Sequence, residues 1–169
     1  MILTELEIDG RLRKILMQAH TNGHFYVLDR EDGTLLSAEK YAKSTWAKYI
    51  DIETGKPVLS EEAKYRDGGP SLIWPSPFGS HNWQSMSYSP NTGLVYIPET
   101  QLAGEYSVGP DPEFRDKFLR VNILVDYKEV VENDGTGSLL AWDPVENKAA
   151  WQARHSSFWN GGVLSTAGD

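Results

Sequence analysis

The sequence predicts an all-β fold made of short antiparallel sheets repeated around a centre. A cassette recurs along the chain: an apolar or aromatic run, then Asp or Ser, three residues, and Gly or Asn. It occupies residues 29–33, 51–55, 89–93 and 143–147. Asp and Ser side chains accept bonds from backbone N–H groups ahead of them, and Gly or Asn tolerates a positive φ, so each cassette predicts a hairpin turn. Repeated hairpins flanked by strand-forming residues are typical of sheets that bury their faces only against neighbouring sheets.

The first hairpin is the clearest element. Strand-like runs at residues 14–19 and 25–29 are joined through Asn22 and Gly23, a strong signal for chain reversal. The turn that follows leads into a third strand at residues 34–38. This part of the chain therefore predicts an antiparallel meander.

The later hairpins follow the same pattern. Residues 83–88 and 94–97 predict strands on either side of one cassette, and we expect Pro98 to end the second strand because proline lacks the N–H that a sheet needs. Residues 137–143 and 148–154 predict the last hairpin. Residues 164–169 resemble the approach to a further strand.

Two stretches fit the repeat poorly, and we interpret both as surface excursions. Residues 39–71 are polar and irregular, with one possible short strand at residues 46–52. Residues 99–137 contain Pro110 and Pro112 and show no clean period, so they predict a short helix or an insertion packed outside the sheets.

Composition limits the classes of function. The 169-residue chain is 40% hydrophobic, enough for an ordinary core, and its formal charge of -8 argues against a nucleic-acid partner, which would require clustered Lys and Arg. The chain has no cysteine, which excludes a disulfide or thiolate site. No run approaches the about 18 apolar residues of a membrane span, and residues 1–10 are acidic, unlike a secretory signal.

Longer motifs in the sequence carry a family resemblance. Ala141, Asp143, Asn147 and Trp151 stand at the spacing of a tryptophan-docking motif, in which the Trp packs on the neighbouring blade of a propeller. Together with residues 22–30, 81–98, 139–144 and 159–168, this motif resembles the pyrroloquinoline quinone (PQQ) dependent methanol/ethanol dehydrogenase family. These segments occur in the family's order and cover most of the chain.

The resemblance implies an all-β fragment, about two to three blades, of an eight-bladed β-propeller with PQQ near its axis, and residues 1–169 form one partial domain. It implies oxidation of a small primary alcohol to an aldehyde by hydride transfer to PQQ. It also implies a cytochrome c type electron acceptor and a periplasmic location. The calcium ligands, the catalytic aspartate and the lid cysteines of the family are expected before Met1, so we expect no catalytic residue and no metal ligand in this chain, and no activity from it alone.

The resemblance also names candidate cofactor contacts. Asn82 and Trp83 match the family's Asn-Trp pair at the quinone, and Trp159 and Asn160 match a second segment near the cofactor. The structural alternative is that Asn82 caps a turn, Trp83 fills a gap between blades and the Gly161-Gly162 pair serves strand packing. Thr21 occupies the position of a Lys or Arg that would stabilise negative charge on the quinone oxygens.

The residue at position 21 leaves the function open. A threonine hydroxyl donates one hydrogen bond but carries no charge, so either another cation compensates, Lys14 and Arg30 being near in sequence, or the ordinary activity is lost. If the ordinary activity is lost, the chain is part of a non-catalytic propeller scaffold. A third hypothesis is a sugar-binding β module with Trp46, Trp74 or Trp83 as its stacking platform.

Overall fold

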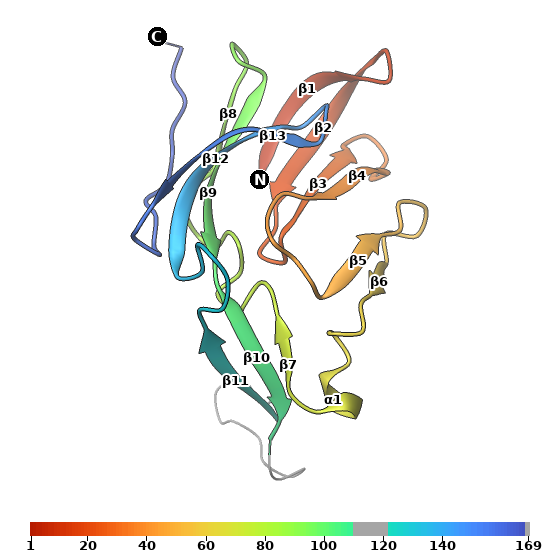
Figure 1. Cartoon of the computed structure of the whole chain (residues 1–169). Helices are drawn as coiled ribbons and strands as arrows, with labels where there is room; N and C mark the ends of the chain where they lie inside the picture. The colour runs from red at the N-terminus through yellow and green to blue at the C-terminus, as the bar shows by residue number, and fades with distance from the viewer. Residues whose placement is uncertain (110–121, 168–169) are drawn as a thin grey trace.

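The computed structural model describes residues 1–109 and 122–167, which are almost entirely strands and loops. Two four-stranded antiparallel sheets form the larger part (Figure 1). The first sheet has the order β1-β2-β3-β4, with bounds Ile2–Ile8, Arg11–Ala19, His24–Asp29 and Leu35–Lys40. The second has the order β13-β12-β9-β8, with bounds Lys148–His155, Thr136–Asp143, Leu94–Gln101 and Ser87–Ser89. Each sheet has the four antiparallel strands of one propeller blade.

The four cassettes all form the predicted hairpin turns. In the first turn Gly33 N–H donates to the carbonyl of Asp29 at 2.9 Å, and the Asp29 carboxylate accepts from Glu31 N–H at 2.9 Å. The cassettes at residues 51–55, 89–93 and 143–147 likewise connect consecutive paired strands. The last residue of each has a positive φ, between 52° and 71°. The asparagine at the end of the last cassette thus has the conformation that glycine has in the others.

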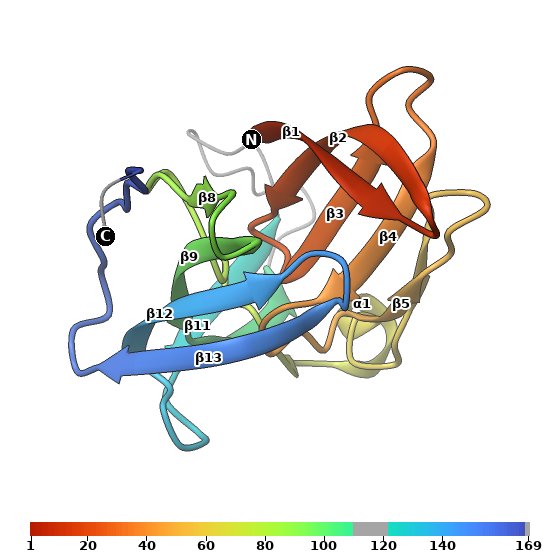
Figure 2. The ribbon, with the colours of Figure 1, turned by 90° about the horizontal axis from the view of Figure 1, so that it is seen from above.

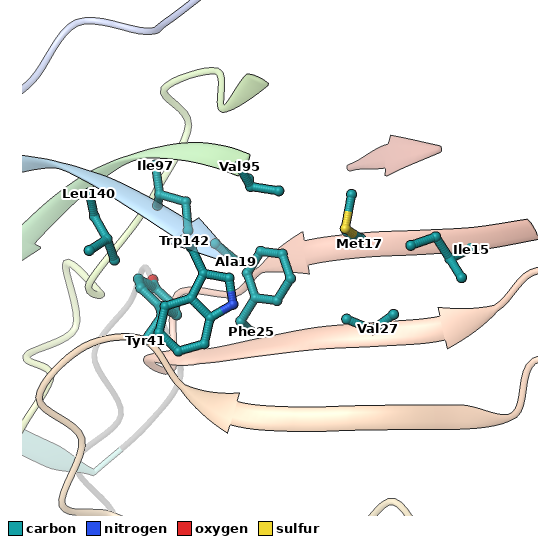
Figure 3. Packing of buried hydrophobic residues seen from close by; sticks show 10 residues of the cluster. All are labelled: Ile15, Met17, Ala19, Phe25, Val27, Tyr41, Val95, Ile97, Leu140 and Trp142. Atoms are coloured by element: carbon teal, nitrogen blue, oxygen red, sulfur yellow. The ribbon is translucent and has the colours of Figure 1, made fainter. Parts of the chain in front are cut away.

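The core of the molecule lies between the two four-stranded sheets. Phe25 of β3 and Trp142 of β12 meet across this interface, with ring centroids 5.9 Å apart (Figure 3). Ten buried residues from both sheets and the β4–β5 connection form the cluster: Ile15, Met17, Ala19, Phe25, Val27, Tyr41, Val95, Ile97, Leu140 and Trp142. Figure 2 shows the two sheets side by side, as in neighbouring blades.

Two strands correct the sequence prediction. Residues 1–10 contain β1, whose alternately half-buried residues pair with β2, so the period-2 pattern of Ile2 to Ile8 was an overlooked signal. The expectation that Pro98 ends its strand is wrong, since β9 continues to Gln101. On the edge where Pro98 lacks an N–H, β9 faces a loop, and there the Pro98 carbonyl bonds the His81 ring at 2.9 Å. The β9–β12 ladder is on the other edge and stays intact.

Both predicted excursions contain strands. The first contains β5 (Ala47–Ile50), which confirms the short strand expected there, β6 (Pro57–Leu59) and the four-residue helix α1 (Tyr65–Gly68). A three-stranded sheet β11-β10-β7 joins Ile123–Lys128, Ala103–Val108 and Ser71–Ile73. Figure 1 shows this sheet and α1 at the lower end of the molecule, below the two large sheets. Part of the second excursion, residues 110–121, lies outside the described residues.

The last strand forms an open side of the second sheet. All eight residues of β13 are exposed, and its ladder partner in the described chain is β12. Trp151 stands opposite Ala141 and is 45% exposed, whereas Trp142 on the neighbouring strand is buried. Residues 156–167 follow as an irregular segment without a strand. The β13 edge therefore remains open in the described chain, with Trp151 partly exposed beside it.

Candidate functional site

One loop brings the predicted site residues together. Residues 74–86 connect β7 to β8, and the loop is anchored on β9 by two bonds from Thr100: its N–H donates to Ser80 O at 2.8 Å and its hydroxyl donates to Gly79 O at 3.0 Å. Ser76 N–H donates to Leu102 O at 2.8 Å. Asn82 and Trp83 are in this loop, and the other candidates contact it from two sides.

Thr21 contacts the loop from the first four-stranded sheet, here called the first blade; the second sheet is the second blade. It lies in the reversal between β2 and β3, where Gly23 has φ 87°. Ser80 N–H donates to Thr21 O at 3.0 Å, and a Cβ on Gly79 would lie 2.8 Å from the Thr21 Cβ. Only glycine permits this close approach, so Gly79 sets the position of Thr21 relative to the loop.

The reversal that carries Thr21 is held by hydrogen bonds from side chains of the β4–β5 connection. The carbonyl of Asn22 accepts from Trp46 Nε1 at 2.8 Å and from the Ser44 hydroxyl at 3.2 Å. The Tyr41 hydroxyl donates to the His20 carbonyl at 2.9 Å. Backbone carbonyls of the turn are thus satisfied by side chains of the β4–β5 connection, which fixes the direction of residue 21.

Asn82 and Trp83 have very different environments from the histidine before them. The Asn82 amide donates to the Phe78 carbonyl at 2.9 Å, a bond of the kind expected for the structural alternative of a turn cap. Trp83 is 76% exposed, so in the described chain it does not fill a gap between blades. His81 is buried, and burial lowers its pKa although its bond to the Pro98 carbonyl acts in the opposite direction. The His81 ring anchors the loop through its bond to the Pro98 carbonyl, and the two residues after it are exposed.

Trp159 and Asn160 approach the loop from the end of the second blade. Trp159 packs edge-on against Phe78, with centroids 5.5 Å apart, and Asn160 Nδ2 donates to the Glu99 carbonyl at 2.8 Å. Of the glycine pair, Gly162 is closely packed, because a Cβ there would lie 2.2 Å from Ser85 Oγ, whereas a Cβ on Gly161 would meet open space. The sequence did not single out Phe78, whose ring stacks on Tyr127 and packs edge-on against Phe158 and Trp159.

The structure separates the proposed compensating cations from position 21. Lys14 lies five residues before the end of β2 and pairs with Glu31 at 3.0 Å, and the Arg30 N–H donates to the Lys14 carbonyl. At about 3.3 Å per residue, these residues lie about 16 Å away from the Thr21 reversal. The interpretation that Lys14 or Arg30 compensates is therefore wrong in this structure.

The three tryptophans considered as sugar platforms are not equivalent. Trp74 is buried, its Nε1 donates to Asp134 at 3.0 Å, and the Lys43 ammonium covers its ring at 3.8 Å. Trp46 is half-buried and bonds the Asn22 carbonyl. The hypothesis that Trp74 is a sugar platform is therefore wrong, because no ring face of this residue is open to a sugar.

The buried carboxylate of Asp134 accepts a hydrogen bond from the Trp74 indole. Burial by itself would raise the pKa of Asp134, but the N–H groups of Val131 and Val130, the Trp74 indole and the Gln101 amide donate to it and lower the pKa overall. In residues 1–109 and 122–167 no group of three or more His, Cys, Asp or Glu is placed to hold a metal ion.

No helix in the described part of the chain is long and apolar enough to cross a membrane.

Comparison with known proteins identifies the class. The chain is 51% identical over 168 residues to the quinohemoprotein alcohol dehydrogenase ADH IIB of Pseudomonas putida, covering 99% of this chain and 24% of that protein. It is 38% identical over 173 residues to the lupanine 17-hydroxylase [cytochrome c] of a Pseudomonas species, covering 99% of this chain and 24% of the relative. No family model matches the chain.

The solved structures agree with the sequence comparison. The quinohemoprotein alcohol dehydrogenase ADHIIG from Pseudomonas putida HK5 superposes with a TM-score of 0.86 at 40% identity, over 98% of this chain and 26% of that one. Two four-stranded sheets with open edges are thus part of a quinoprotein β-propeller. The chain belongs to the PQQ-dependent alcohol dehydrogenase family, and it spans about a quarter of the length of the relatives that it matches.

Proposed function

We propose that this chain forms one side of the quinone site of a PQQ-dependent alcohol dehydrogenase that oxidises an alcohol to an aldehyde. The observation that carries the proposal is the convergence on the loop at residues 74–86. Thr21 contacts it through Gly79 and Ser80, and Trp159 contacts it through Phe78, although these segments are far apart in sequence. Such convergence is expected where strands of neighbouring blades point toward a common ligand.

The exposed residues of the loop fit a flat ligand with several carbonyl groups. Trp83 is exposed and offers an aromatic surface, and the exposed Asn82 amide offers both a donor and an acceptor. When bound, PQQ would supply the hydride acceptor. The task of this chain is then to hold and orient the cofactor with Asn82, Trp83 and, from the second blade, Trp159 and Asn160.

Thr21 limits what the chain itself contributes to the chemistry. Its hydroxyl can donate one hydrogen bond to a quinone oxygen, which stabilises developing negative charge less than a charged donor does. The base and the calcium ligands are expected elsewhere in the protein. We therefore expect no alcohol oxidation by the isolated 169 residues, and weak PQQ affinity.

A cytochrome c is the electron acceptor that we expect, because the relative named lupanine 17-hydroxylase [cytochrome c] carries it in its name. The periplasm is the expected location, on the family resemblance. A c-type cytochrome reduced by the complete protein in periplasmic extract, and not in cytoplasmic extract, would support both.

The second candidate, a propeller scaffold without catalysis, is favoured by one observation: the neutral residue at position 21. A chimera separates the two. The corresponding segment of Pseudomonas putida ADH IIB is replaced by this chain, and PQQ-dependent dye reduction is measured with alcohols. The enzyme hypothesis predicts measurable turnover and a rise of about tenfold or more on Thr21→Lys. A folded chimera that binds PQQ but is inactive in both forms would favour the scaffold.

Calorimetry tests the isolated chain. Titration with PQQ and calcium is expected to show no micromolar binding, because most of the cavity belongs to the rest of the propeller. Micromolar or tighter affinity would contradict this part of the proposal.

A further inference from the structure

The sequence contains two Asn-Gly pairs, Asn22–Gly23 and Asn160–Gly161, and their surroundings differ. In such a pair the backbone nitrogen of the glycine can attack the side-chain carbonyl carbon of the asparagine, because the glycine has no Cβ to obstruct the approach. The attack needs a glycine N–H that is free of hydrogen bonds and an asparagine side chain that can turn toward it. The hydrogen bonds around each pair therefore decide how fast it reacts.

The first pair is held firmly in the reversal between β2 and β3. Gly23 is buried, and its N–H donates to the His20 carbonyl at 3.1 Å. The Asn22 side chain is bonded at both ends, because Oδ1 accepts from His24 N–H at 3.0 Å and Nδ2 donates to the Tyr26 hydroxyl at 2.9 Å. Side chains of the β4–β5 connection donate to the Asn22 carbonyl at 2.8 and 3.2 Å. Attack at this pair requires the whole reversal to open.

The second pair lies in the irregular segment after β13. Gly161 is exposed, and its N–H makes no hydrogen bond within residues 1–109 and 122–167. A Cβ on Gly161 would meet no atom within 4 Å. The next backbone hydrogen bond along the chain runs from Val163 N–H to the Ser85 carbonyl at 2.9 Å. The attacking nitrogen is thus free in the second pair and bonded in the first.

Two contacts hold the Asn160 side chain. Its Nδ2 donates to the Glu99 carbonyl at 2.8 Å, and its Oδ1 contacts Nε2 of His155. Both groups lie over Gly137, where a Cβ would be 2.6 Å from the His155 ring and 2.9 Å from Asn160 Nδ2. His155 is exposed at the end of β13, so this arrangement opens more readily than the buried reversal around Asn22. The two contacts slow the attack without preventing it.

We propose that Asn160 is a site of spontaneous deamidation and that Asn22 is protected. The Gly161 nitrogen bonds to Cγ of Asn160, the Cγ–Nδ2 bond breaks, and ammonia leaves with the proton of the Gly161 nitrogen, which closes a succinimide ring. Solvent water then opens the ring at either carbonyl, and the product is aspartate or isoaspartate. No oxidant or reductant takes part. This modification goes beyond the proposed function and needs no cofactor.

Deamidation removes a bond that fixes the Trp159 segment. The Asn160 amide donates to the Glu99 carbonyl, whereas a carboxylate has no N–H to donate and repels that oxygen. Trp159 directly precedes Asn160, is 44% exposed and packs edge-on against Phe78 at 5.5 Å. In the modified chain we therefore expect a looser contact between Trp159 and the loop at residues 74–86.

Mass spectrometry of the full 169-residue chain tests the site. Trypsin separates the two pairs into residues 15–30 and 155–169, each with one asparagine. The chain is incubated in oxygen-18 water at pH 8 and digested in ordinary water, so that deamidation during digestion carries no label. The peptide of residues 155–169 should take up label at least about tenfold faster than the other. No label in residues 155–169, or equal rates in both peptides, would overturn the proposal.

Gly161→Ala tests the attacking residue. The new Cβ obstructs the nitrogen but extends into open space, at a backbone conformation outside the left-handed region. We expect the rate at Asn160 to fall at least about tenfold and the melting temperature to stay unchanged. An unchanged rate in the folded variant would overturn the attack by residue 161.

His155→Ala tests the contact that holds the amide. The variant removes one of the two contacts of Asn160, so deamidation there should become about fivefold faster. Lys148→Ala, exposed at the other end of β13, is the matched control and should leave the rate unchanged. An unchanged or slower rate in His155→Ala would overturn the protective role of His155.

Asn160→Asp tests the consequence for Trp159. In the nitrogen-15 labelled chain, the indole N–H signal of Trp159, assigned with Trp159→Phe, should shift or broaden. The signal of Trp142, which is buried in the core, should stay in place. An unchanged Trp159 signal would overturn the loosening of this segment. All these measurements use the chain without PQQ, so their outcome is independent of the proposed function.

Discussion

The interface between the two large sheets and the end of the molecule that carries the loop at residues 74–86 differ in the interactions that hold them. The interface is apolar and closed, and Ile15, Phe25 and Ile97 within it are fully buried. At the loop end the contacts are mostly backbone hydrogen bonds and glycine approaches, and Trp83 is 76% exposed. Stability therefore resides between the blades, while the loop end is positioned by the blades and leaves its side chains open for a ligand.

The largest effect is expected in the interface. Phe25→Ala removes a fully buried ring that packs against Trp142, and we expect a loss of about 4 kcal/mol in the free energy of unfolding. Leu12→Ala, at a residue 72% exposed, should change it by less than about 0.5 kcal/mol. Urea unfolding followed by tryptophan fluorescence measures both. Similar losses for the two variants would contradict the assignment of stability to the interface.

A pH effect is expected next, from the histidine behind the Thr21 reversal. Burial, and then the charge of Lys40, lower the pKa of His24 from 6.5 to about 4. The unfolded chain binds this proton below pH 6.5 and the folded chain does not, so stability is complete above pH 6.5 and falls as the pH drops toward 4. We expect a loss of about 3 kcal/mol over this window from His24.

His24→Phe is the matched variant for this prediction. It keeps a ring against Trp46 and removes the two ring nitrogens, which have no hydrogen-bond partner in the described structure. Urea unfolding at pH 7, 5.5 and 4 should show a shallower loss of stability in the variant. A pH dependence identical in the two proteins would show that His24 does not titrate in this way.

A third prediction tests the glycine that sets the loop against Thr21. Gly79→Ala adds a Cβ 2.8 Å from the Thr21 Cβ at a φ of 78°, and we expect a cost of about 2–3 kcal/mol. Gly55→Ala has a φ of 67° with open space around it and should cost about 1 kcal/mol. Thermal unfolding compares them. Equal costs would mean that the close approach to Thr21 is unimportant.

The smallest effect on stability is expected at the exposed indole. Trp83→Ala should change the free energy of unfolding by less than about 0.5 kcal/mol, because the side chain is open to solvent. In the chimera the same substitution should weaken PQQ binding by up to about tenfold through the lost aromatic contact. A large loss of stability without an effect on PQQ would place Trp83 among the packing residues.

The fold was predictable where local chemistry determines it. The Asp-to-Gly cassettes depend on interactions within five residues, so their hairpins could be read directly from the sequence. The path of β9 through Pro98 could not, because it depends on which edge of the strand faces a loop, a property of the tertiary structure. Strand β1 could have been found from its alternation, which we did not use.

The sequence named candidate site residues, which stay a prediction, but it did not predict how they are arranged. The family motifs named Asn82, Trp83 and Trp159, whereas the contact of Phe78 with Trp159 joins segments far apart in sequence and appears only in the folded chain. Likewise Lys14 is near Thr21 in sequence but far along an extended strand. The difference between the two Asn-Gly pairs depends on the surroundings of each, which no sequence pattern encodes.

A crystal structure of the chimera grown with PQQ tests the central claim most directly. We predict that the quinone lies on the loop at residues 74–86, with the Asn82 amide within hydrogen-bond distance, about 2.7–3.2 Å, of one of its oxygens. A structure with PQQ bound and Asn82 on the outer rim of the propeller, remote from the cofactor, would contradict the account.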